Sequence, residues 1–421
     1  MVKILILAAA NISTCPRPMR MLELLKDEIM DKTHEVSVMG IDSESGAKMP
    51  PVRLRASESR SDTPKHASLE SSLDSEITLP SFSYPAYKRR SRLQELRLWL
   101  DVALSRWDRL AFTHNRLHII DHLRAHRYDV IICHDLLLLP ALFRGLGENP
   151  HRTKVIFDAR EFYPLQNTSS LRWRLLFKRF NAHLCRTYAQ KADIMLSVSP
   201  HFCHLYKQHF GLNARTFMSL PPYFALTPSK TNPAKVKILY HGALNQNRGI
   251  DEVVELITRL EGRFSIDFIF TGGERAFRAK IESKIAALIA QGYALRLLEP
   301  VRLEEIIPFG HAYDLGLLYV PAHNANLRAT LPNKLFEYTQ SRLGLIMPPL
   351  ESATALISRY RNAAVAEDFS MEALARVINA LGTEDIEQLK NASRKAASEL
   401  HLGQNKQILR ECLAQVLRPM S

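Results

Sequence analysis

Short apolar runs alternate with helical patterns along most of this chain, and this alternation constrains the fold more than any other feature. Apolar runs of about four to eight residues between helices are typical of parallel β-strands that helices cover on both faces. The alternation restarts once, after residue 233. The sequence therefore predicts an α/β fold with two doubly wound, Rossmann-like sheets. The expected strands are residues 3–8, 35–39, 129–133, 154–157 and 194–198 in the first series, and 237–240, 265–270, 294–298, 315–319 and 344–347 in the second.

A proline-rich segment separates the two series. Residues 220–233 contain four prolines in fourteen positions, which excludes a helix or a central strand and predicts an interdomain linker. A chain of 421 residues also exceeds a single comfortable core. We therefore expect domains at 1–220 and 234–388, a linker at 221–233 and a helical tail at 389–421 that packs back across either domain. The carboxyl ends of the strands should face a shared cleft.

The charge of the chain indicates an anionic partner. The net charge is +13, which suits phosphates, an acidic membrane, nucleic acid or an acidic polymer. No nucleic-acid-binding module is recognisable, and the arginines are not interleaved with stacking aromatic residues, so we expect no nucleic acid. Five scattered cysteines without CxxC spacing argue against disulfides and structural zinc and favour a reducing compartment. The apolar opening residues are expected to form a first strand rather than a signal peptide.

Two segments of the first half depart from the alternation. Residues 44–78 are rich in serine, proline and charge and predict a long loop. Residues 87–107 have a helical pattern with basic residues and two tryptophans, which suits either a helix on an anionic bilayer or a core-packed helix with a solvated basic face. The acidic residues in this segment favour the core-packed helix. Its apolar residues at helical spacing are Leu93, Leu96, Leu100, Ala103 and Leu104.

The stretch 331–338, Leu-Pro-Asn-Lys-Leu-Phe-Glu-Tyr, is the most informative for function. Asn333 and Lys334 follow a proline at an expected helix start, where free amides and a lysine charge suit a diphosphate. Glu337 lies on the same helical face, and its carboxylate can accept two hydrogen bonds from a ribose diol. A capped helix start with an ordinary ion pair would produce the same pattern.

Two further loops in the second series suit an anion. Gly242 follows the strand at 237–240 and permits a tight turn against a ligand, and Arg248 stands just before a helix, where a guanidinium can grip phosphate. The strand at 265–270 ends in Gly272 and Gly273. Three such loops at strand carboxyl ends in one domain predict a nucleotide site.

These motifs together resemble glycosyltransferase family 4, the retaining GT-B enzymes that use nucleotide sugars. The best-matching sections are 238–254, 269–274 and 331–346, and the strands at 128–135 and 155–164 look like the acceptor side of the cleft. The resemblance implies that Arg248 and Lys334 neutralise the donor diphosphate and that Glu337 holds the ribose. Gly242 and Gly273 would let the backbone approach the donor. Such enzymes need no metal or other cofactor, because basic residues and a helix dipole stabilise the leaving group.

The chain departs from the family at two positions. The family commonly carries a second glutamate eight positions before the one at Glu337, and this chain has Ala329 there. Relatives also often have a histidine at the position of Arg160, which is a permanent cation and no general base at neutral pH. We take Arg160, Glu161 and His134 as candidate catalytic residues on the acceptor side. His134 and Glu161 each have a structural alternative.

Arg17 follows the first strand and could contact an anionic acceptor or a lipid phosphate, or be an ordinary surface arginine. The expected activity is transfer of a sugar from a nucleotide-diphosphate sugar to a glycan or lipid-linked acceptor, with retention. The expected setting is surface polysaccharide synthesis in the cytoplasm, peripherally on the inner face of the cytoplasmic membrane. Two alternatives stay open: a sugar-nucleotide epimerase of the same fold, and a degenerate GT-B scaffold that binds a membrane or polyanion.

Overall fold

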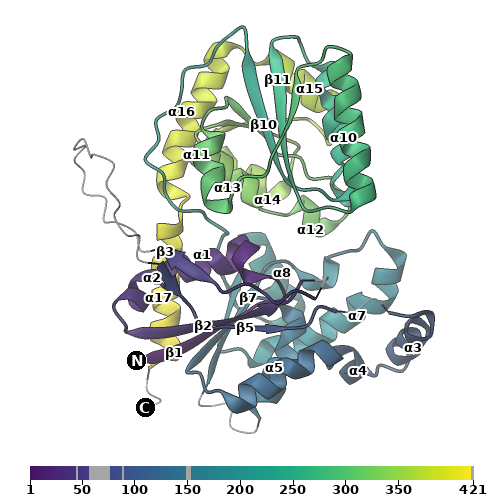
Figure 1. The fold of residues 1–421 in the computed structure, drawn as a ribbon, viewed down its shortest axis with the longest axis vertical. Helices are drawn as coiled ribbons and strands as arrows, with labels where there is room; N and C mark the ends of the chain where they lie inside the picture. Colours follow the sequence, from purple (N-terminus) through teal and green to yellow (C-terminus); the bar gives the residue numbers. More distant parts are fainter. Residues whose placement is uncertain (44–45, 56–75, 88–89, 148–152, 419–421) are drawn as a thin grey trace.

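The computed structural model describes residues 1–43, 46–55, 76–87, 90–147 and 153–418, which form two α/β domains stacked along the long axis (Figure 1). The N-terminal domain contains a parallel sheet of order β5-β2-β1-β6-β7-β8-β9. In this order the strands are Ser81–Tyr84, His34–Ile41, Val2–Leu7, Val130–Cys133, Lys154–Ala159, Ile194–Ser197 and Ala214–Thr216.

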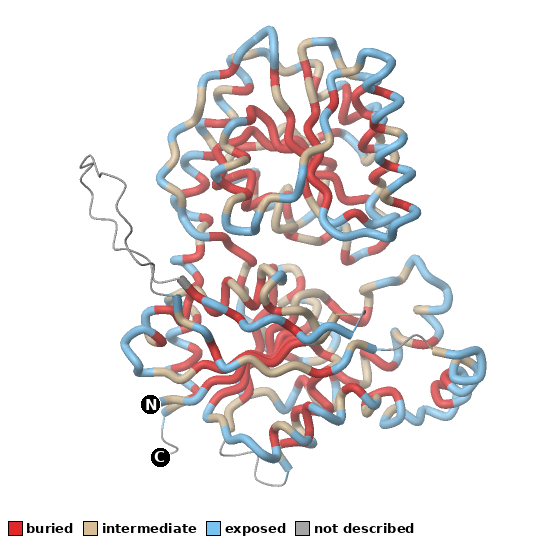
Figure 2. The backbone as a smooth tube through the Cα atoms, in the orientation of Figure 1, coloured by how far each residue is buried: buried red, intermediate tan, exposed pale blue. Residues whose placement is uncertain are grey.

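The C-terminal domain repeats this design with a parallel sheet of order β12-β11-β10-β13-β14-β15. Its strands in this order are Leu295–Leu298, Phe264–Thr271, Val236–Ala243, Leu315–Leu317, Gly344–Met347 and Ala363–Val365. Figure 2 shows both sheets as buried centres beneath more exposed helices, as expected for parallel sheets covered on both faces. The predicted α/β fold with two doubly wound, Rossmann-like domains is confirmed.

Helices connect the strands and cover both faces of each sheet. Those of the N-terminal domain are α1 (Pro16–Leu24), α2 (Lys26–Met30), α3 (Arg92–Ala103), α4 (Trp107–Ala111), α5 (His114–Ala125), α6 (Leu139–Leu146), α7 (Leu171–Thr187) and α8 (Pro200–Phe210). Those that follow are α9 (Ile250–Glu255), α10 (Arg275–Ala290), α11 (Ile306–Gly310), α12 (Ala325–Arg328), α13 (Asn333–Gln340), α14 (Glu351–Ser358), α15 (Met371–Ala380), α16 (Thr383–Glu399) and α17 (Leu402–Val416). None of the helices in the described ranges combines the length and the apolar character needed to cross a bilayer.

The ten expected strands are all present, and three of the four edge strands of the two large sheets were missed. β5, β9 and β15 have three or four residues each and lack a long apolar run, as is common at sheet edges. The loop expected at 44–78 falls partly outside the described residues, at 44–45 and 56–75. Its described ends, β3 (Arg53–Arg55) and β4 (Glu76–Thr78), pair as an antiparallel ribbon.

The chain crosses between the domains at two adjacent places. After the first crossing, the buried Arg342 donates to the carbonyls of Phe224 and Leu226 and fixes the linker to the C-terminal domain. The second crossing joins α16, which packs on the C-terminal domain, to α17, whose apolar side belongs to the N-terminal core (Figure 1). The amide of Leu402 donates to the carbonyl of Pro221 at 2.7 Å, so the two crossings are held together. The tail thus contacts both domains.

The interpretation of α3 as a core-packed helix is wrong for its leucines. Leu93, Leu96, Leu100 and Leu104 are all exposed. The helix instead buries the side that carries Leu98, Asp101 and Val102. Arginines pair with Asp101, so this carboxylate can be buried. The acidic residue that was expected to favour core packing of the leucines therefore lies on the side of the helix opposite to them.

Candidate functional site

The two sheets place their switch points opposite one another. In each sheet the strand order reverses beside the first strand of the domain, at β1 and at β10, and ligands of such sheets bind outside the carboxyl ends there. A cavity of about 960 Å³ lies at this place, which is large enough for a nucleotide sugar. Its lining includes Ser13, Thr14 and Pro16 after β1, and Tyr240, His241, Gly242, Arg248, Thr271, Gly272, Tyr319, Val320, Asn333, Lys334 and Glu337 from the C-terminal domain.

Lys334 is the second residue of α13 and lines the cavity. Its ammonium nitrogen lies 3.7 Å from the centre of the Tyr240 ring. A Cβ at Gly242 would lie 2.9 Å from the Lys334 Cε, and Gly242 has a φ of +148°, so only glycine fits there without strain. Burial, with a smaller contribution from the Arg248 charge, lowers the pKa of Lys334 to about 7. The Glu337 charge has the opposite but smaller effect.

Arg248 supplies the second cation of the cavity. It ends the 3-10 turn Gln246–Arg248 after β10, and Gly249, in the left-handed region with φ of +63°, then starts α9. Its side chain is exposed and lines the cavity. Its positive charge lowers the pKa of Lys334. It also lowers the pKa of Glu161 in the N-terminal domain and so favours the carboxylate form of that residue. Arg248, Lys334 and the first-turn amides of α13 thus form a site complementary to a diphosphate.

Glu337 lines the same cavity, but an arginine of the other domain already contacts it. Arg20 of α1 donates to the Glu337 Oε1 at 2.7 Å and to the Asn333 Oδ1 at 3.3 Å. It also donates to the Ser219 carbonyl at the first crossing. Arg20 was missed by the sequence analysis. Its only signal was its position three residues after Arg17 on the same helix, which any surface arginine could share.

His241 lies beneath Glu337 as a neutral side chain. Its Nε2 is 3.7 Å from the Glu337 Oε2, and burial together with the charge of Lys334 lowers the pKa of His241 to about 3. The hydroxyl of Tyr338 accepts from the His241 amide, and the two rings pack edge to face. Among the described residues, none donates a hydrogen bond of ordinary length to the other oxygen of Glu337, Oε2.

His134 and Arg17 share a buried carboxylate. Asp158, at the end of β7, accepts from the Nε and Nη2 of Arg17 at 2.6 and 2.5 Å and from the His134 Nδ1 at 2.7 Å. Burial alone would raise the pKa of Asp158, but the Arg17 charge and these hydrogen bonds outweigh it and hold the pKa below its usual value. The surface position considered for Arg17 is wrong, because only 6% of it is exposed. Neither Arg17 nor His134 lines the cavity.

Arg160 and Glu161 lie nearer to the interdomain space. One Arg160 amino group donates to both Asp135 oxygens at 2.8 Å. The negative charge of Asp135 raises the pKa of Arg160 above its ordinary value. Arg160 is thus a fixed cation. Burial raises the pKa of Glu161, while the charges of Arg160 and Arg248 and a hydrogen bond from Asn326 oppose that rise. Glu161 therefore faces groups of both domains.

Gly273 is outside the cavity lining, which includes its neighbours Thr271 and Gly272. Gly273 has a φ of +99°, and a Cβ there would lie 2.9 Å from the Cβ of Leu244 and 3.0 Å from its carbonyl oxygen. The glycine is required because two loops pack against each other at this point. The pattern of two adjacent glycines could not show which one faces a ligand.

Ala329, at the position of the missing family glutamate, contacts the other domain. It is 1% exposed and belongs to the apolar core cluster of the N-terminal domain. Just before it, Asn326 donates to the Phe162 carbonyl at 2.9 Å. A glutamate at Ala329 would place a carboxylate among apolar side chains, so this loop docks the two domains instead.

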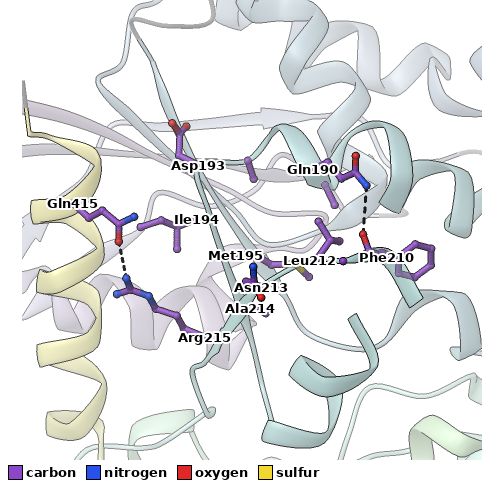
Figure 3. A pocket seen from close by; sticks show the side chains of 13 residues that line it. Gln190, Asp193, Ile194, Met195, Phe210, Leu212, Asn213, Ala214, Arg215 and Gln415 are labelled. Carbon is purple, nitrogen blue, oxygen red and sulfur yellow. Dashed lines mark hydrogen bonds between the residues drawn. The ribbon is translucent and has the colours of Figure 1, made fainter. Parts of the chain in front are cut away.

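A second hollow, of about 490 Å³, lies at the β8–β9 edge of the N-terminal sheet (Figure 3). Its polar groups largely satisfy one another. Arg215 donates to the Gln415 side chain at 2.6 Å, and Gln190 donates to the Phe210 carbonyl. Predicted site residues are absent from its lining, so the interdomain cavity is the candidate site. Among the described residues, no group of three His, Cys, Asp or Glu side chains is placed to hold a metal ion.

Solved structures match this architecture over its full length. The apo structure of OtsA has a TM-score of 0.62 at 13% identity, with 100% of both chains covered. The α,α-trehalose 6-phosphate synthase of Burkholderia multivorans has a TM-score of 0.62 at 11% identity, with 99% of this chain and 97% of the other covered. Anabaena Alr3699/HepE, in complex with UDP, has a TM-score of 0.62 at 12% identity, with 98% and 100% covered.

At these identities the likeness establishes the fold, which is that of GT-B glycosyltransferases. The sequence matches no protein-family model and no curated protein. Membership of family 4 in particular stays a prediction.

Proposed function

We propose that this protein is a glycosyltransferase that takes a sugar from a nucleotide-diphosphate sugar and transfers it to a glycan or lipid-linked acceptor. The observation that carries the proposal is that Arg248, just before α9, and Lys334, in the first turn of α13, both line the cavity at the switch points of the two sheets. Burial and the Arg248 charge lower the pKa of Lys334, so an anion bound beside it would favour its charged form. Anabaena HepE, of the same fold, has been solved with UDP and with UDP-glucose, so UDP sugars are the first donors to test.

The proposed mechanism is retaining and uses no protein nucleophile. The bond between the anomeric carbon and the diphosphate oxygen breaks while the acceptor hydroxyl attacks the same face of the sugar. The acceptor proton passes to the departing phosphate oxygen. Arg248, Lys334 and the amides of α13 stabilise the negative charge that develops on the leaving diphosphate, a role that needs no metal.

Glu337 and Asn333 would position the nucleoside. The Oε2 of Glu337 can accept from a ribose hydroxyl, while Arg20 donates to Oε1 and so orients the carboxylate. Gly242 keeps the space above Lys334 open for the phosphates.

The acceptor would enter between Glu161 and the N-terminal loops. Glu161 lies between cations of both domains and can orient an acceptor hydroxyl, with Arg160 as a fixed positive charge beside it. Arg17 and His134 both donate to Asp158 and so would fix the strand end that leads into Arg160 and Glu161. The setting we propose is cytoplasmic synthesis of a surface polysaccharide.

Turnover of a panel of nucleotide sugars tests the function. Each donor is incubated with the full chain, with and without glycan or undecaprenyl-type lipid acceptors, and the products are separated. We expect release of the nucleoside diphosphate, increased by an acceptor, from at least one donor. Conversion of the donor to an isomeric nucleotide sugar without acceptor would establish the epimerase instead. No turnover and no binding of any donor would reject both enzymes.

A further inference from the structure

Helix α3 carries a row of exposed leucines. Leu93, Leu96, Leu100 and Leu104 have exposed fractions of 80, 62, 56 and 57%. Their spacing of three or four residues places them along one side of the helix, roughly opposite the side that buries Leu98 and Val102. Trp99, beside the row, is also exposed. Figure 2 shows α3 as a largely exposed element at the margin of the N-terminal domain.

The beginning of α7 is tied to α3 on the side of α3 that carries Leu98 and Val102. Arg172 donates to both oxygens of Glu95 at 2.9 and 2.7 Å and so ties the start of α7 to α3. Leu171 and Leu175 of α7 are 62 and 51% exposed. We call the row of exposed leucines on α3 the leucine face. Its members are Leu93, Leu96, Leu100 and Leu104.

The charges around the leucine face are positive. Helix α7 carries five basic residues and no acidic one: Arg172, Arg174, Lys178, Arg179 and Arg186. The acidic residues of α3 are neutralised within the protein, because Glu95 pairs with Arg172, and the buried Asp101 pairs with Arg106 and Arg109. An apolar row bordered by arginine and lysine is complementary to the interface of an anionic bilayer, with leucines among the acyl chains and cations at the phosphates.

We propose that the leucine face docks this protein on an anionic lipid bilayer. A second copy of the chain or a protein partner could also cover leucines. Two equal basic surfaces would repel each other, however, so the charge favours lipid. The proposal concerns attachment and stands apart from the proposed sugar transfer, since no residue of the leucine face lines the interdomain cavity.

The docked face would lie close to the acceptor side of the cleft. Helix α7 is fixed to the segment that follows Glu161, because Asn181 donates to the Tyr163 carbonyl at 3.0 Å. A bilayer held at α3 and α7 would thus present its head groups near the wall where an acceptor would enter. This placement suits a lipid-linked acceptor.

Vesicle co-sedimentation of the full chain tests the proposal. The vesicles are phosphatidylcholine alone and phosphatidylcholine with about one third phosphatidylglycerol. The test variant is Leu96→Gln with Leu100→Gln, and the matched control is Leu117→Gln with Ile289→Gln, two apolar residues that are 41 and 46% exposed elsewhere. Thermal unfolding confirms that both variants fold, which is expected since all four side chains are exposed.

We expect binding to the anionic vesicles that weakens with added salt, at least about tenfold weaker binding by the test variant, and no change in the control. Lys178→Glu with Arg179→Glu should weaken binding similarly. Equal binding by the test and control variants, or no binding by the wild type, would overturn the proposal. So would a wild-type dimer that the test variant converts to monomer without any vesicle binding, since a second copy would then cover the face. Donor affinity is measured in parallel and should be the same for all variants, so the two proposals can fail separately.

Discussion

Binding of a nucleotide sugar should take up about one proton from solution at pH 8, and Lys334 should be the group that accepts it. In the free protein its pKa is lowered to about 7 by burial and by Arg248. At pH 8 the side chain is then roughly 90% neutral. A diphosphate beside it favours the ammonium form and raises the pKa back toward 10.5, so binding and protonation are coupled.

The sign and the pH window follow from this pKa. Below about pH 6 Lys334 is charged with or without ligand, so proton uptake should approach zero and affinity should not vary. Above pH 7 uptake should rise toward one proton, and affinity should fall as pH increases, by about tenfold between pH 8 and 9. A donor sugar is a better probe than UDP, because its diphosphate is esterified at both ends and has no proton that titrates in this range.

Calorimetry of UDP-glucose binding in several buffers of different ionisation enthalpy measures the uptake directly. The dependence of the observed enthalpy on the buffer gives the number of protons. Lys334→Met, which keeps the apolar stem, should bind more weakly and show no uptake. A wild-type protein with no uptake at pH 8, or a Lys334→Met variant with undiminished uptake, would refute the assignment of Lys334 to the diphosphate.

Three further substitutions test the structure around the site. Gly273→Ala should lower the free energy of unfolding by about 1–3 kcal/mol in a denaturant titration, because its Cβ would press on Leu244, while donor affinity stays unchanged. Ala329→Glu should destabilise the protein by about 2–4 kcal/mol, because it buries a carboxylate in the N-terminal core, and an unchanged midpoint would contradict this docking. Arg20→Met should lower the free energy of unfolding by about 2–3 kcal/mol, because it leaves Glu337 without its arginine partner. In a double-mutant cycle, adding Glu337→Gln should restore part of this free energy.

The sequence predicted the sheets well because their signal is local. The run Ile238–Leu239–Tyr240 is apolar at successive positions and therefore on both faces of its strand, which indicates a sheet covered by helices on both sides. Three of the four edge strands had no such run. Residues 214–216, for example, pair with β8 through backbone hydrogen bonds that place little demand on side-chain type.

The candidate site was predictable where one loop carries the chemistry and unpredictable where two domains meet. Lys334 and Gly242 were chosen independently from separate motifs, and the structure brings them into contact. The Arg20–Glu337 pair joins residues 317 positions apart, and no local pattern encodes such a contact. The role of Ala329 was equally hidden, because its burial depends on the surface of the other domain.

The central claim is that Arg248, together with Lys334, holds the diphosphate of a nucleotide sugar. Equilibrium dissociation constants for UDP-glucose at pH 6.5, for the wild type, Arg248→Ala and Arg275→Ala, test it most directly. Arg275 is an exposed arginine at the start of α10, in the same domain and outside the cavity lining, so it controls for loss of charge alone. We expect Arg248→Ala to weaken binding by about 10- to 100-fold and Arg275→Ala to leave it unchanged. Equal dissociation constants for all three proteins would contradict the claim.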